Sequence, residues 1–355
     1  NCIALDLFIN CKKSCEELKL YDDFYSKICE VIDNMQSLLI GENGAILEKY
    51  YRENGGDITV IGKENCGHHP HSLENAEPIA DFIEKAFTID CERKDSGAVY
   101  YSDSVYMARL QSMPHVMEMT YNRVVKACIE RYARCPKDVG YMLGIGNAYY
   151  FPMFEEALNR YDVPLELKYL PVIESALNAK AKSPVGAMGL WQFMVGTGKI
   201  YGLEVNSMVD ERRDPRKASD AAARFLADLY KLYVDWHLVI AAYNCGPGNV
   251  AKALRIANGK RNFWEIYPYL PRETRSYVPL FIAANYIMNF YEEHNMCPAT
   301  PLFNYATDTI MISDRVHLQQ IAEKVNIPLD ELKFLNPQYR YDIIPGNIKP
   351  YPLVV

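Results

Sequence analysis

The stretch LPVIESALNAKAKSPVGAMGLWQFM, residues 170–194, places one acidic residue and two glycines inside an apolar frame. Glu174 is the acidic residue, and apolar residues surround it in the sequence: Leu170, Val172, Ile173, Ala176 and Leu177. A carboxyl group in apolar surroundings has a raised pKa, because burial disfavours its charged form. A raised pKa suits a general acid that must hold its proton near neutral pH. Taken alone, however, this stretch is better explained by a surface glutamate on an amphipathic helix.

The second half of the stretch indicates a tight turn. Gly186 and Gly189 allow the backbone to turn sharply or to approach another segment closely. Trp191 and Gln192 add an aromatic face and an amide, although Trp191 by itself is better explained as a core residue.

A third polar cluster follows in AAYNCGPGN, residues 241–249. Tyr243 and Asn244 come at the predicted end of a helix, directly before a Gly-Pro-Gly turn. A helix end can project side chains into a cleft, and it can equally be capped by Asn244. Both interpretations remain open at this point.

The sequence around these clusters predicts an almost entirely α-helical region over residues 102–295. Its clearest helix runs from Pro215 to Tyr233, with Asp214 as N-cap and a continuous apolar stripe on one face. We expect a second helix to begin at a Thr120 cap. The remaining predicted helices cover residues 103–111, 138–143, 149–160, 236–243, 249–257 and 272–293.

The pattern changes after residue 298. Residues 309–312 and 351–355 are strand-like, and residues 316–325 and 329–335 have helical spacing. The C-terminal segment is therefore predicted to be a small β-α-α-β unit.

The first 98 residues form an N-terminal region of unknown role. A helix is predicted over residues 14–39 and a strand over residues 58–61. The run from Cys66 to His71 contains potential zinc ligands, but its spacing is irregular and its Gly and Pro favour a linker, so we predict no metal there. The ten cysteines permit disulfides without showing any.

The bulk properties narrow the class of protein. The formal net charge of -7 gives no global basic surface, which argues against non-specific nucleic-acid binding. The longest apolar runs are far shorter than a membrane span requires.

Together, IESALN, GAMGLWQFM and AAYNCGPGNV resemble the three motifs of the soluble-lytic-transglycosylase family, whose fold is similar to goose-type lysozyme. The segments DERRDP (210–215) and LPRETRSYVP (270–279) resemble its membrane-bound lytic transglycosylase D subgroup, and the C-terminal unit resembles a LysM module. The resemblance implies a mainly α fold: a lysozyme-like helical catalytic domain over residues 99–296, with its motif core at 164–290, and a small LysM-like module over residues 307–355.

The resemblance also implies the site. Glu174 corresponds to the family's single catalytic carboxylate, and Ser175 to the hydroxyl that orients the N-acetyl group of the substrate. The other substrate-binding residues implied are Gln192, Tyr243, Asn244 and Tyr277. No second catalytic carboxylate is evident, because we expect Asp210, Glu211 and Asp214 to cap a helix or pair with neighbouring arginines.

The implied function is cleavage of the MurNAc-GlcNAc β-1,4 bond of peptidoglycan with formation of a 1,6-anhydromuramoyl product, and no cofactor or metal. A hydrolytic muramidase of the same fold and a catalytically inactive peptidoglycan-binding scaffold are the alternatives. The implied partners are peptidoglycan glycan strands, and no nucleic acid. We expect a monomer in the bacterial cell envelope, in the periplasm, with anchoring to the outer membrane left open.

Overall fold

The computed structural model describes residues 97–301 and 307–355, which belong to one compact unit with a helical part and a small C-terminal module. The predicted helix at 14–39, the predicted strand at 58–61 and the Cys66–His71 segment lie outside these residues. Within the described ranges, no helix is long and apolar enough to cross a membrane.

The long helix α11 (Pro215–Tyr233) forms as the sequence predicts. The Asp214 carboxylate accepts hydrogen bonds from the Arg216 and Lys217 amides, both at 3.0 Å, and so satisfies two donors of the first turn. The buried stripe of α11 includes Ala218, Ala222 and Leu226. Small residues on this stripe let α8 and α12 pack closely against the helix.

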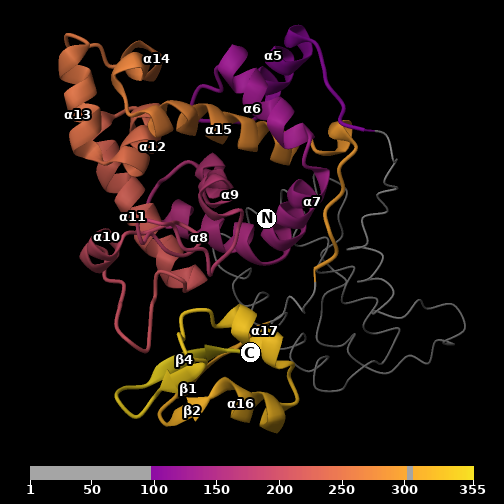
Figure 1. Cartoon of the computed structure of the whole chain (residues 1–355), viewed down its shortest axis with the longest axis vertical. Coiled ribbons are helices and arrows are strands. Elements are labelled where there is room, and N and C mark those ends of the chain that lie inside the picture. Colours follow the sequence, from indigo (N-terminus) through magenta and orange to yellow (C-terminus); the bar gives the residue numbers. More distant parts are fainter. Residues whose placement is uncertain (1–96, 302–306) are drawn as a thin grey trace, which may run out of the picture. The chain divides into compact units, whose positions relative to one another are not determined.

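Figure 1 shows the other helices of the helical part, and all of them except α10 share one apolar core with α11. They are α5 (Asp103–Ser112), α6 (Arg123–Ala133), α7 (Pro136–Ile145), α8 (Phe151–Arg160), α9 (Leu170–Ser175), α10 (Val195–Ile200), α12 (Trp236–Cys245), α13 (Pro247–Ile256), α14 (Phe263–Ile266) and α15 (Arg272–Asn289). Short π or 3-10 turns lie at Gly146–Tyr150, Leu165–Tyr169, Tyr267–Tyr269 and Glu292–His294. The predicted mainly α class is confirmed.

Between residues 120 and 151, three helix starts differ from the prediction, each for a local reason. The cap of α6 is Asn122 and not Thr120, because the Asn122 side chain accepts from the Val124 and Val125 amides at 2.9 and 3.0 Å. Helix α7 begins at Pro136, since proline suits the first helical position. A π turn separates α7 from α8, so α8 begins at Phe151.

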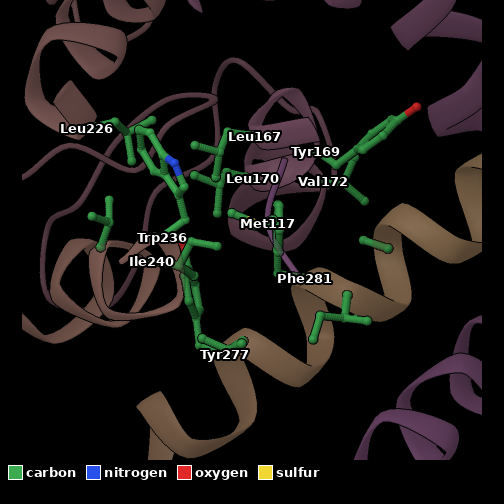
Figure 2. Close-up of a cluster of buried hydrophobic side chains, with 14 of the residues drawn as sticks. Met117, Leu167, Tyr169, Leu170, Val172, Leu226, Trp236, Ile240, Tyr277 and Phe281 are labelled. Atoms are coloured by element: carbon green, nitrogen blue, oxygen red, sulfur yellow. The ribbon is translucent and has the colours of Figure 1, made fainter. Parts of the chain in front are cut away.

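Helix α15 holds the short helix α9 in place. It packs against α6, α9 and α12. Figure 2 shows the shared cluster, in which Leu170 and Val172 of α9 lie near Ile240 of α12 and Phe281 of α15. Burial of these side chains fixes α9 in the core and leaves its last residues at the edge of the packed region.

The C-terminal module contains two small antiparallel sheets and two helices. Its elements are β1 (Thr309–Ile312), β2 (Arg315–His317), α16 (Leu318–Val325), α17 (Leu329–Leu335), β3 (Ile343–Pro345) and β4 (Tyr351–Val354). Strand β1 pairs with β4, and β2 pairs with β3. The predicted β-α-α-β order was therefore incomplete, because residues 316–317 belong to a strand and not to the following helix.

Candidate active site

Glu174 lies at the end of α9, where the chain takes an unusual path. The next two residues, Ala176 and Leu177, have φ values of 49° and 59°, although neither is glycine. Their amides close the helix by bonding to the Val172 and Pro171 carbonyls at 3.2 and 3.3 Å. Left-handed backbone at non-glycine residues costs free energy and concentrates at functional sites. The strain here turns the chain sharply just after Glu174.

The Glu174 side chain is largely enclosed but keeps part of its surface open. Burial raises the pKa of Glu174 to about 7, while a hydrogen bond donated by the Tyr277 hydroxyl acts in the opposite direction. Neither influence is another carboxylate. The group therefore holds its proton near neutral pH, as the sequence predicted, and has a donor ready for its ionised form.

Tyr277 and Tyr243 remain protonated around Glu174. Burial raises the pKa of both phenols well above the usual value, and the charge of Glu174 raises it further. Tyr277 comes from α15, in the apolar cluster of Figure 2, and Tyr243 comes from α12. Both can act as hydrogen-bond donors over the whole pH range in which Glu174 titrates.

The turn at residues 185–193 forms the next wall of the site, and two predicted residues bind to its backbone. The Ser175 hydroxyl lies 2.9 Å from the Leu190 carbonyl oxygen and 3.0 Å from that of Pro171. The Tyr243 hydroxyl donates to the Trp191 carbonyl at 2.7 Å. The three sequence motifs therefore meet around Glu174.

The side chains of this turn divide between core and site. Trp191 is fully buried, with its indole N–H donating to the Ser219 hydroxyl at 2.9 Å, so it is a core residue as expected. Gln192 has a φ of 50° and is partly exposed. Its side-chain nitrogen donates to the Gly189 carbonyl at 2.8 Å and to the Ala181 carbonyl at 3.3 Å. These two bonds fix the orientation of the Gln192 side-chain amide.

Gly189 is required by the space around it as well as by its φ of 84°. A Cβ at this position would lie 1.8 Å from the Arg212 carbonyl oxygen. The sequence therefore correctly indicated a close backbone approach at Gly189, although it did not indicate to which segment.

Asn244 is exposed at the end of α12, and a residue that the sequence reasoning missed holds it. The hydroxyl of Thr274, on α15, donates to the Asn244 side-chain oxygen at 2.8 Å. Thr274 itself is buried. The signal was present in the segment LPRETRSYVP, but only the fold shows that Thr274 faces α12.

The acidic residues of the DERRDP segment are engaged in structural roles. Asp210 binds Arg212 through both carboxylate oxygens, at 2.9 and 2.8 Å. Glu211 pairs with Lys217 and accepts from the Glu204 amide at 2.7 Å. Asp214 caps α11. The expectation of capping and arginine pairing holds for Asp214 and Asp210, whereas Glu211 pairs with a lysine instead.

Comparison with known proteins gives two family matches. Residues 152–266 match the Transglycosylase SLT domain, and residues 306–355 match the Lytic transglycosylase MltD, LysM-like domain.

Individual relatives agree with these matches. The chain is 34% identical over 201 residues to the membrane-bound lytic murein transglycosylase D of Escherichia coli strain K12, covering 56% of this chain and 44% of the relative. It is 36% identical over 118 residues to the soluble lytic murein transglycosylase of the same strain, covering 31% of this chain and 18% of the relative. The chain thus spans less than half the length of these relatives.

Among solved structures, the 70 kDa soluble lytic transglycosylase of Escherichia coli matches 42% of this chain and 26% of its own, with 28% identity and a TM-score of 0.36. The sequence matches thus cover residues 152–266 with the Transglycosylase SLT domain and residues 306–355 with the MltD LysM-like domain, and the chain is homologous to the membrane-bound lytic murein transglycosylase D of Escherichia coli.

Proposed function

We propose that this protein is a peptidoglycan lytic transglycosylase that cleaves the MurNAc-GlcNAc β-1,4 bond and leaves a 1,6-anhydromuramoyl end. The observation that carries the proposal is Glu174, a carboxyl whose pKa burial raises to about 7 and whose hydrogen-bond partner is a tyrosine. The SLT domain and the named relatives support the same activity.

Glu174 acts first as the acid. Its proton passes to the glycosidic oxygen as the bond from that oxygen to muramoyl C1 breaks, and the bonding electron pair leaves with the GlcNAc oxygen. The carbonyl oxygen of the substrate's N-acetyl group stabilises the positive charge that develops at C1. A pKa near the working pH favours this step, because the protonated form is populated and still acidic enough to donate.

Glu174 then acts as the base. The carboxylate accepts the proton of the muramoyl C6 hydroxyl, O6 bonds to C1, and the 1,6-anhydro ring closes without consuming water. The Tyr277 hydroxyl stabilises the carboxylate between the two steps, because a donor to the ionised form lowers its energy. Two-carboxylate glycosidases use a second acid for water or for a covalent intermediate, and here the acids of the DERRDP segment are engaged elsewhere.

The glycan strand is proposed to lie along the surface made by the three motifs. Ser175, Gln192, Tyr243, Asn244 and Tyr277 are its proposed contacts. Ser175 and Tyr243 donate to backbone carbonyls, so their hydroxyl oxygens can accept hydrogen bonds from N–H or O–H groups of the sugars. We assign residues 99–296 to the catalytic domain and 307–355 to the LysM-like module. We propose that the protein acts in the bacterial cell envelope, as a monomer that needs no cofactor.

The experiment is digestion of purified peptidoglycan by wild type and by Glu174→Gln, followed by mass spectrometry of the released muropeptides. Glu118→Gln, on an exposed loop, is the matched control. We expect anhydro ends from wild type and control and almost no release by Glu174→Gln. Reducing ends would show a muramidase. Binding of peptidoglycan without release by wild type would show an inactive scaffold.

A further inference from the structure

Asp210 is the buried centre of a charge network outside the reaction, formed with the buried Arg212 and the partly exposed Arg340. Its side chain is 0% exposed, and Arg212, which binds both of its oxygens, is 3% exposed. Burial alone would raise the pKa of Asp210, but the hydrogen bonds and charge of Arg212, together with the charge of Arg340, hold it below the usual value. Asp210 therefore remains an ion inside the protein, where charges interact strongly and are well ordered.

The network extends on one side to the turn at residues 185–193, which borders the candidate site. Nη1 of Arg212 donates to the Gly186 and Phe193 carbonyls at 2.9 and 3.0 Å, and so ties both ends of the turn at residues 185–193. The Arg212 carbonyl oxygen also packs against Gly189 so closely that no side chain fits there. This is the turn that Ser175 and Tyr243 contact, and it contains Gln192.

On the other side the network extends into the LysM-like module. Nη2 of Arg340 donates to Oδ2 of Asp210 at 2.9 Å. The backbone joins as well, since the Asp210 amide donates to the Gln338 carbonyl and the Arg340 amide to the Met208 carbonyl, both at 2.9 Å. Val209, which is 1% exposed, packs into the core of the module.

We infer that the LysM-like module holds the candidate site in shape, with Arg340 as a positioning residue that acts through Asp210 and Arg212 on the proposed substrate-facing turn at residues 185–193. The inference rests on the proposed function in one respect, namely that the turn at residues 185–193 contacts the substrate. Bonded members of one buried network adopt a joint arrangement, so disturbing one end displaces the other. The module thus contributes to substrate binding from a distance, whether or not it binds sugar itself.

A second contact between the module and the helical part provides a control. Lys349 pairs with Glu204 at 2.7 Å, and these side chains are 56% and 26% exposed, compared with 32% and 0% for Arg340 and Asp210. Glu204 also accepts from the Tyr351 hydroxyl and the Asn206 side-chain amide, and its backbone amide donates to the Glu211 carboxylate. None of these three partners belongs to the turn at residues 185–193. Each pair therefore joins a cation of the module to a carboxylate of the helical part. Only the Arg340–Asp210 pair continues, through Arg212, to the turn at residues 185–193.

The test compares the charge reversals Arg340→Glu and Lys349→Glu in the full chain, with Arg340→Lys as the conservative variant. Hydrogen exchange is followed on peptides covering residues 181–194. The amides of Met188, Gly189 and Phe193, which are bonded to protein carbonyls, report on the turn. We expect Arg340→Glu to exchange there roughly tenfold faster, the size of a network coupling, and Lys349→Glu to stay within about twofold of wild type.

Kinetics on a soluble peptidoglycan fragment complete the test. Arg340→Glu should raise KM roughly tenfold and leave the pH at which kcat falls unchanged, because Glu174 does not contact the network. Arg340→Lys should restore both exchange and KM, since a lysine keeps the charge beside Asp210. A thermal unfolding scan of each variant separates loss of the fold from loosening of the turn.

Unchanged exchange at residues 188–193 in a folded Arg340→Glu protein would overturn the inference. So would equal effects of the Arg340 and Lys349 reversals. The exchange readout does not depend on catalysis, so this role of the module can be confirmed or overturned even if Glu174→Gln remains active and the proposed function fails.

Discussion

Burial acts to raise the pKa of two carboxyl groups, Glu174 and Asp210, yet their pKa values shift in opposite directions. Burial raises the pKa of Glu174 to about 7, and the hydrogen bond from the neutral Tyr277 phenol opposes this rise only in part. Burial also acts to raise the pKa of Asp210, but Arg212 and Arg340 outweigh it and lower the pKa. The comparison teaches that burial does not decide the role of an acid. The charge of its neighbours does.

The largest effect expected from this comparison is on the rate. Glu174→Gln removes the only proton carrier of the proposed mechanism, so turnover should fall by roughly 10²–10⁴-fold, while the fold is retained. Release of soluble muropeptides measures the rate and circular dichroism the fold. Wild-type release by a folded Glu174→Gln protein would contradict the assignment.

Removing the other acid should damage stability instead. Asp210→Ala leaves Arg212 buried without its counterion, so the free energy of unfolding should fall by about 3–5 kcal/mol. Denaturant unfolding at neutral pH measures it. The control is Glu265→Ala, which breaks an exposed pair with Lys260 and should cost at most about 1 kcal/mol. Equal losses in the two variants would show that Asp210 is no structural ion.

Removing the Tyr277 hydroxyl that donates to Glu174 should have an intermediate effect. Tyr277→Phe removes the donor that favours the ionised carboxylate, so the pKa of Glu174 should rise and the fall of kcat at high pH should move to higher pH. The rate at neutral pH should fall roughly tenfold, the scale of a hydrogen bond to a charged group. Tyr269→Phe, at an exposed tyrosine, is the control. A pH profile that stays in place or moves down would contradict the role.

The smallest expected effect is the contribution of Glu174 to the pH dependence of the free energy of unfolding. A raised pKa in the folded state means that ionisation is disfavoured there, so wild type loses stability as pH rises from about 5 to about 7. Glu174→Gln does not titrate, and its stability relative to wild type should increase over that window by about 1–2 kcal/mol. Thermal unfolding at pH 5 and pH 8 measures this. A variant that is less stable than wild type at the higher pH would contradict the raised pKa.

Local signals predicted much of the fold. The helix from Pro215 to Tyr233 and its Asp214 cap were evident, because the cap, the proline and the apolar stripe all lie within one segment. The pairing of β2 with β3 was missed, since their partners lie far apart in the sequence. Threonine and asparagine are both residue types that cap helices, so the sequence offered Thr120 and Asn122 alike. Only the folded helix shows that the Asn122 side chain accepts from the first amides of α6.

The site was predictable for a similar reason, and only up to a similar limit. The apolar residues beside Glu174 suggested the raised pKa that the structure shows, although alone they were better explained by a surface glutamate, and only the other two motifs favoured the site. The sequence also indicated that Gly189 allows a close backbone approach. It could not show that Arg340 reaches Asp210 from the C-terminal module, because a salt bridge between distant segments has no local pattern. The sequence therefore predicted the candidate site residues better than the long-range contacts that hold their turn in place.

The most direct test of the account is the fate of water during cleavage. Purified peptidoglycan is digested by the wild-type protein in water carrying a heavy oxygen isotope, and the new muramoyl ends are analysed by mass spectrometry. If Glu174 acts alone as acid and then base, the ends are 1,6-anhydro rings without heavy oxygen. New reducing ends that carry the heavy isotope would contradict this mechanism and identify the protein as a hydrolase.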